Sequence, residues 1–277
     1  DLGIIGFSSL IVPTHLIQRG FSELPPIFLN LFLPGIAGAE AAGLYGIARK
    51  IASVLHIIRL SFDYVLAPLA AVHASINWAE VQTMYSYATR LASMLVLPLS
   101  AGLIAARTDI AALFGAEATG AATIIVILAL GRCLETMTGP AAALIEVLGR
   151  RVLPLINNLL SLAMLIILGF ILTPKYGALG MALATAISLN IAAFSAMAQL
   201  IMLHKLHPFG PGYYRAIIAG GLASIVLLSL MLLPEALPLY STLALAVVLC
   251  ITSVIVLLKS GLSPIDRVSR KVLKKGK

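Results

Sequence analysis

Long apolar segments follow one another along the whole chain, separated by short polar connections. Each segment is long enough for an α-helix to cross the ~30 Å hydrocarbon core of a bilayer, which takes about 20 residues. Eight such segments are expected, at about residues 4–33, 39–72, 84–106, 118–148, 152–172, 178–203, 216–233 and 237–258. The pattern therefore predicts an all-α fold, a polytopic membrane helix bundle with eight transmembrane helices.

Proline and glycine pairs predict where these segments bend or end. Pro25-Pro26 is expected to interrupt the first segment, and Gly139-Pro140 is expected to kink one long fourth helix. The run Thr173-Pro-Lys-Tyr-Gly177 separates the fifth segment from the sixth.

The composition agrees with a lipid environment. Apolar residues make up 60% of the chain and charged residues 11%, and the mean hydropathy is +1.05. Soluble domains have about 25% charged residues, so a soluble protein is excluded. The net charge of +8 is spread over short connections and a terminal tail, which indicates membrane topology and no nucleic-acid partner.

The basic residues are distributed unevenly between the two sides that eight spans would define. Arg107 and Lys175 fall on one side, and eleven basic residues fall on the other: Arg150, Arg151, Lys205, Arg215, Lys259, Arg267, Arg270, Lys271, Lys274, Lys275 and Lys277. Cytoplasmic loops carry the excess of Lys and Arg, so both ends of the chain are expected in the cytoplasm. Residues 261–277 form a basic cytoplasmic tail, which either sets orientation or binds anionic lipid.

Ionisable residues recur at helical spacing inside the first two segments. His15, Arg19 and Glu23 lie four residues apart and share one face of the first segment. In the second segment a seven-residue repeat places three more polar side chains on one face, with a fourth between them and a lysine adjacent: Arg49, His56, Asp63, Arg59 and Lys50. Because a charge at membrane depth costs roughly 2.5–3.5 kcal/mol, such stripes usually face a bundle interior or a water-filled cavity.

The fourth segment adds Arg132 and Glu135, three residues apart, and Glu146 returns to nearly the same face three turns later. A purely structural explanation of these stripes would be buried ion pairs between neighbouring residues: Arg19 with Glu23, Arg59 with Asp63, and Arg132 with Glu135. Pairing leaves an excess of cations, which predicts a positive cavity lining and an anionic ligand, since arginine forks suit phosphate. The first four segments, residues 1–150, are therefore expected to hold the cavity-lining face.

These patterns assign candidate roles. The expected ligands of an anionic headgroup are His15, Arg19, Arg49, Lys50, His56 and Arg59, and the expected ion-coupling or pairing residues are Glu23, Asp63, Arg132 and Glu135. No catalytic motif, metal-ligand spacing or phosphate loop is found in the sequence, so we expect no enzyme activity, cofactor or metal. A Na⁺- or proton-coupled exporter of cationic small molecules and a non-transporting membrane scaffold remain alternatives.

Several short motifs carry a family resemblance. They are GLYGIARK at 43–50 followed by LAP at 66–68, LFGAE at 113–117, LGR at 148–150 with the asparagine pair at 157–158, and LTPKYGALGMALAT at 172–185. In order and spacing the chain resembles the polysaccharide-flippase branch of the multidrug/oligosaccharidyl-lipid/polysaccharide exporter superfamily.

The resemblance implies a carboxy-terminal half, helices seven to fourteen of a fourteen-helix flippase, so the chain is expected to begin inside a longer protein. Residues 1–205 would form the transporter lobe with six membrane helices, and residues 206–260 would form two additional peripheral helices. It further implies alternating access in the bacterial cytoplasmic (inner) membrane and a substrate carried on a polyprenyl pyrophosphate, such as an O-antigen or polysaccharide repeat unit. The expected partners are this lipid-linked glycan, membrane lipids, and the missing amino-terminal half or a second copy.

Overall fold

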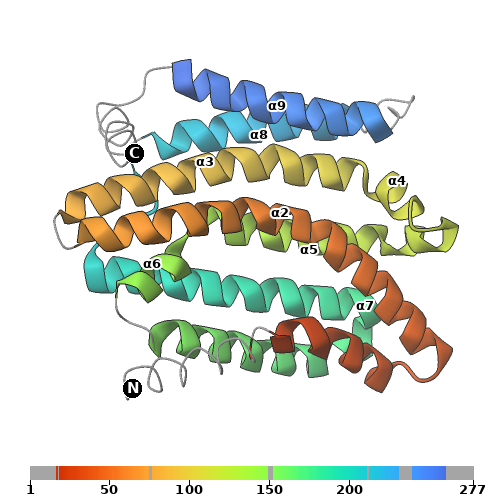
Figure 1. Ribbon diagram of the computed structural model, residues 1–277. Helices are drawn as coiled ribbons and strands as arrows, with labels where there is room; N and C mark the ends of the chain where they lie inside the picture. The colour runs from red at the N-terminus through yellow and green to blue at the C-terminus, as the bar shows by residue number, and fades with distance from the viewer. Residues whose placement is uncertain are drawn as a thin grey trace.

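The computed structural model describes residue 17 and residues 19–74, 77–148, 152–210, 212–230 and 239–259 (Figure 1). These residues form helices joined by short turns and contain no strand, which confirms the predicted all-α membrane fold. Four of the helices are long and apolar enough to cross a membrane. The count of eight spans stays a prediction.

The helices follow the apolar segments closely. After a first helix over residues 19–32, the chain forms α2 (Ile36–Ala74), α3 (Trp78–Ala105), α4 (Arg107–Ala112), a 3₁₀ helix (Ala116–Ala121), α5 (Ala122–Met137), α6 (Ala141–Val147), α7 (Val152–His204), α8 (Tyr213–Leu230) and α9 (Leu239–Lys259). The first helix runs without a break through Pro25 and Pro26, so the predicted interruption there is wrong.

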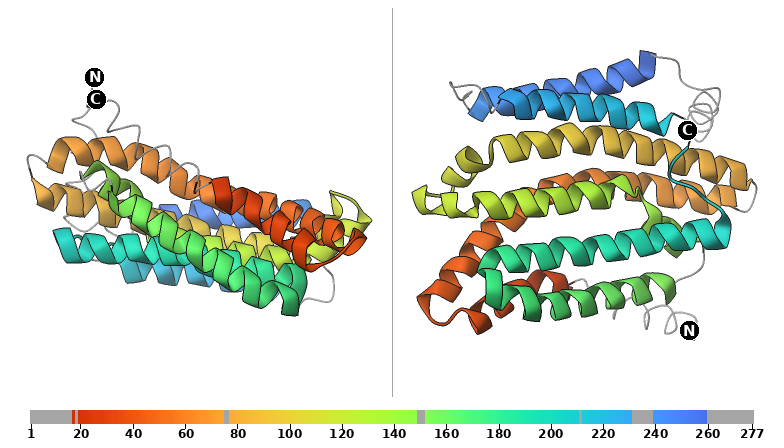
Figure 2. Two further views of the ribbon diagram at one scale, coloured as in Figure 1. Left: turned by 90° about the horizontal axis from the view of Figure 1, so that it is seen from below. Right: turned by 180° about the vertical axis from the view of Figure 1, so that it is seen from behind.

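The element labelled α7 is a hairpin of two antiparallel helices. At Gly177 the backbone has φ 57° and ψ −133°, a non-helical conformation that a residue with a Cβ rarely adopts. Across the hairpin Asn157 and Gln199 exchange two side-chain hydrogen bonds, at 2.8 and 2.7 Å. The predicted separation of the fifth and sixth segments is therefore confirmed, and both halves are visible side by side in Figures 1 and 2.

The expected single fourth helix is divided into α5 and α6. Gly139 lies between them with φ 69°, and Pro140 cannot donate the backbone hydrogen bond that would continue the helix. The freed groups have other partners, since Tyr85 donates to the Thr138 carbonyl at 3.0 Å and the Thr138 hydroxyl donates to the Glu135 carbonyl at 2.7 Å. The predicted kink is thus a full interruption.

The order of the helices across the bundle differs from their order along the chain. The helices α8 and α9 pack on α3, which also contacts α2 and α5, while α5 and α6 contact the α7 hairpin (Figure 2). The largest buried apolar cluster joins the first helix, α2, α5 and α7 through side chains such as Leu29, Tyr45, Ile125 and Met181. This arrangement leaves α8 and α9 remote from the α7 hairpin (Figure 1).

Candidate functional site: a polar cavity between α2, α5 and α7

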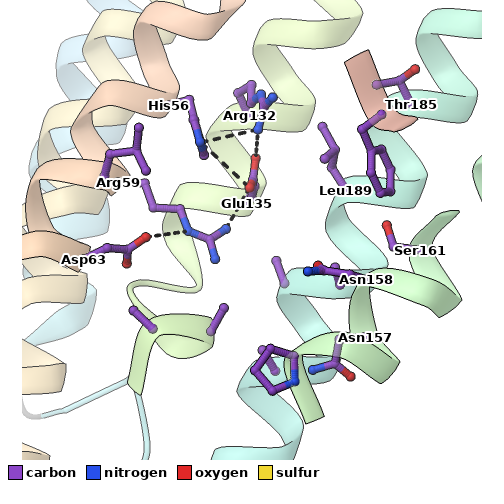
Figure 3. A pocket seen from close by; sticks show the side chains of 18 of the residues that line it. His56, Arg59, Asp63, Arg132, Glu135, Asn157, Asn158, Ser161, Thr185 and Leu189 are labelled. Atoms are coloured by element: carbon purple, nitrogen blue, oxygen red, sulfur yellow. Dashed lines mark hydrogen bonds and ion pairs between the residues drawn. The ribbon is translucent and has the colours of Figure 1, made fainter. Parts of the chain in front are cut away.

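A cavity of about 730 Å³ lies among the first helix, α2, α5, α6 and the α7 hairpin (Figure 3). Its polar lining comprises Ser22, Arg49, His56, Arg59, Asp63, Tyr64, Arg132, Glu135, Glu146, Asn157, Asn158, Ser161 and Thr185. The ionisable side chains come from α2, α5 and α6, and the α7 hairpin contributes neutral polar groups. The cavity therefore has a charged wall and a neutral wall.

Glu135 lies at the centre of the charged wall (Figure 3). Its Oε1 accepts a hydrogen bond from Arg59 Nη1 at 2.8 Å, and its Oε2 accepts one from Arg132 Nη1 at 2.7 Å. Glu135 is 6% exposed and Arg59 is 7% exposed, so the contact between them is buried, whereas the Arg132 side chain is partly exposed. One carboxylate thus joins α2 to α5 by two charge-assisted hydrogen bonds.

Two further ionisable groups flank this centre on α2. Asp63 Oδ2 lies 3.8 Å from Arg59 Nε, and within the described part of the chain Asp63 Oδ1 is buried without a hydrogen-bond partner. His56 Nδ1 lies 3.4 Å from Arg132 Nη1 and 4.0 Å from Glu135 Oε1. Residues 56, 59 and 63 lie three and four positions apart, and this spacing places them on one helix face.

Arg49 satisfies a backbone group that proline leaves open. In a helix the carbonyl of Ser22 would accept a hydrogen bond from the N–H of residue 26, but Pro26 has none. Arg49 Nη1 donates to that carbonyl at 2.9 Å, which ties α2 to the first helix. The Ser22 carbonyl thus has a donor although Pro26 supplies none.

The structure brings together six of the ten predicted site residues: Arg49, His56, Arg59, Asp63, Arg132 and Glu135. Arg19, Glu23 and Lys50 are exposed and do not line the cavity. Among the described residues, no ion pair joins Arg19 to Glu23. His15 lies outside the described residues.

The charges of the cavity lining balance, which corrects the expected positive excess. Three arginines are matched by three carboxylates, those of Asp63, Glu135 and Glu146. Spacing along the sequence gave Arg49 and His56 no partners, but in the structure Arg49 binds a backbone carbonyl and His56 lies beside Glu135. Glu146 is exposed on α6 and Arg49 bonds to Ser22, so the ion pairs around Glu135 join two arginines, Arg59 and Arg132, to two acids, Glu135 and Asp63.

The neutral wall extends the cavity lining beyond residues 1–150, to which the sequence had confined it. Asn157 is held by Gln199, and the Ser161 hydroxyl donates to the Ser188 carbonyl across the hairpin. Asn158 points into the cavity in Figure 3, and its amide makes no hydrogen bond within the described ranges. The sequence feature that could have predicted this wall is the cluster of the asparagine pair and Ser161 within about one helical turn.

Together the fold and the cavity define a multi-pass membrane bundle built around a polar site. No protein-family model matches the sequence, and no curated protein matches it. Two solved structures share the fold. The lipid II flippase MurJ in an inward closed conformation matches with a TM-score of 0.65 and 15% identity over 93% of this chain and 55% of that chain.

The second is a multidrug resistance MATE family transporter of the MOP superfamily in an outward-facing conformation, with a TM-score of 0.55 and 16% identity over 82% of this chain and 53% of that chain. The chain thus spans about half the length of the solved structures it matches. At these identities the likeness shows a shared fold.

Proposed function

We propose that this chain is the carboxy-terminal lobe of a membrane transporter that flips an anionic lipid-linked oligosaccharide across the bacterial cytoplasmic membrane by alternating access. The substrate would be a polysaccharide or O-antigen repeat unit on a polyprenyl pyrophosphate, and both ends of the chain would be cytoplasmic. The fold shared with a lipid II flippase and a MATE transporter supports a transporter. The charged wall and the neutral wall of the cavity support an anionic, sugar-bearing substrate.

The division of the cavity into two walls is the observation that carries this proposal. Arg49, Arg59 and Arg132 supply planar donors that match phosphate oxygens. On the facing wall, the Asn158 amide has no hydrogen-bond partner among the described residues, and amides and hydroxyls are the groups that bind sugar hydroxyls. An oligosaccharide pyrophosphate carries both kinds of partner within one molecule.

A second lobe would complete the site. The chain matches about half of each solved transporter, and the cavity lies between its first helix, α2, α5, α6 and α7. We propose that the amino-terminal half of the same protein, or a second copy of this chain, covers it. The helices α8 and α9, which pack on α3, would then be the two additional peripheral helices.

Arg49→Gln in the complete protein tests the anionic site against a matched control, Lys50→Gln. The two residues are adjacent on α2, but only Arg49 lines the cavity, whereas Lys50 is exposed. Loss of one charge-assisted contact to phosphate is expected to slow translocation roughly tenfold or more. The measurement is flipping of a fluorescent lipid-linked oligosaccharide in liposomes, with protein incorporation quantified for each variant.

Lys50→Gln is expected to flip at the wild-type rate. Equal rates for Arg49→Gln and wild type at equal incorporation would contradict the proposal. Two observations favour one competing function, cation-coupled export of a cationic compound. Asp63 Oδ1 is buried without a hydrogen-bond partner among the described residues, and the cavity lining contains as many carboxylates as arginines. Liposomes loaded with a cationic dye, with and without a Na⁺ or proton gradient, test it directly, and gradient-dependent dye transport without lipid flipping would establish it instead.

A further inference from the structure

Glu135 holds the position that a bound anion would need. Its two oxygens accept one hydrogen bond each from Arg59 and Arg132, at 2.8 and 2.7 Å, and the three side chains converge on the cavity (Figure 3). A carboxylate and a phosphoryl group both present two acceptor oxygens to arginine donors. The protein therefore supplies an internal anion at its own arginine pair.

This internal anion changes what a ligand must provide. Buried guanidinium groups are strongly destabilising without a partner, so an incoming anion has to replace the carboxylate and satisfy both arginines. A phosphodiester lipid carries a single negative charge, so it would replace the Glu135 carboxylate by another group of the same charge and gain no additional ionic contact. A sugar-linked pyrophosphate carries a second negative charge, and Arg49 lines the same cavity.

Resting on the proposed function, we propose that Glu135 is a specificity-determining residue, which lets a pyrophosphate reach Arg59 and Arg132 and excludes the monoanionic phospholipids of the surrounding bilayer. The site thus selects on the charge of the headgroup as well as on its shape.

Glu135→Gln tests the proposal, with Glu146→Gln as the matched control. Both changes remove one negative charge from the cavity lining, but only Glu135 contacts arginines within the described residues. The affinities of the complete protein for a one-sugar polyprenyl pyrophosphate and for phosphatidylglycerol are measured by native mass spectrometry in detergent. The readout is the ratio of the two affinities.

In wild type we expect a clear preference for the pyrophosphate. In Glu135→Gln, phosphatidylglycerol is expected to bind roughly tenfold more tightly, because its single phosphate gains the two arginines that Glu135 occupied. The pyrophosphate already has Arg49 as a further partner in wild type and gains less, so the ratio falls. In Glu146→Gln both affinities should change alike and leave the ratio as it was. An unchanged ratio in Glu135→Gln would overturn the proposal.

Glu135→Asp keeps the test decisive if the glutamine variant does not fold. Aspartate retains the charge but is one methylene shorter, so it cannot reach both arginines as Glu135 does, and the ratio should fall part of the way. A wild-type ratio in this variant counts against the proposal. If wild type binds neither lipid, the proposed function itself fails, whereas pyrophosphate binding with an insensitive ratio refutes only the role of Glu135.

Discussion

Gly131→Ala is expected to destabilise the crossing of α5 and α7. A Cβ built on Gly131 would lie 2.7 Å from the Cβ of Ala186 and 3.1 Å from its Cα, whereas ordinary contacts of this kind begin at 3.4 Å. Both atoms on Ala186 are fixed to the backbone, so the two helices must separate. The next residue is Arg132, and any shift of α5 at this point would move the arginine away from the neutral wall.

The magnitude follows from two opposing terms. Overpacking a well-packed contact costs about 1–3 kcal/mol, and replacing glycine by alanine in a helix returns about 1 kcal/mol. The Asn190 side chain donates to the Gly131 carbonyl at 2.9 Å, and separation of the helices would weaken this hydrogen bond as well. A net loss of about 1–2 kcal/mol is expected from these terms.

The assay is thermal unfolding of purified protein in detergent, with Gly46→Ala as the control. Gly46 lies in α2, and a Cβ added there would meet no described atom within 4 Å, so its alanine variant should be at least as stable as wild type. The double variant Gly131→Ala/Ala186→Gly removes the closest contact, so its loss should be smaller than the sum of the losses in Gly131→Ala and Ala186→Gly. Wild-type stability of Gly131→Ala, or a loss in the double variant equal to that sum, would refute the packing argument.

Two further predictions concern the elements that frame the cavity. Gly139→Ala should lower the unfolding temperature strongly, because φ is 69° at this position and a Cβ would lie 2.1 Å from Thr89 Oγ1; an unchanged unfolding temperature would contradict this reason. Asn157→Leu should cost about 1–3 kcal/mol in thermal unfolding by leaving the partly buried Gln199 amide without its partner, and adding Gln199→Leu should restore most of it. A double variant as unstable as the single one would show that the amide pair is not the cause.

The sequence predicted those features that depend on local spacing. The α7 hairpin follows from a proline and glycine run between two apolar segments, and residues 56, 59 and 63 share a face because they lie within two turns. The same rule shows why Lys50 was misplaced. Adjacent helix residues point in different directions, and in the structure Arg49 lines the cavity whereas Lys50 is exposed.

Contacts between distant helices cannot be predicted from local spacing. Arg59 and Glu135 are 76 positions apart, and their pairing depends on the relative rotation and register of α2 and α5. Pairing by proximity in sequence assigned Arg59 to Asp63 and Arg132 to Glu135, and both contacts exist. The shared carboxylate appears only when the helices are placed together. The neutral wall was missed because charged residues marked the expected site, and the α7 hairpin offers amides and hydroxyls.

The balanced charge of the cavity has a physical reason in a membrane. An empty cavity with three unpaired arginines would leave desolvated cations at a cost of several kcal/mol each, whereas Glu135 and Asp63 keep the charged centre close to neutrality. Binding of an anion then has to compete with groups that already satisfy the arginines. Selectivity at such a site depends on the partners that a ligand finds besides those of the internal carboxylate: a second charge can reach Arg49, whereas a monoanion meets only the arginines that Glu135 already satisfies.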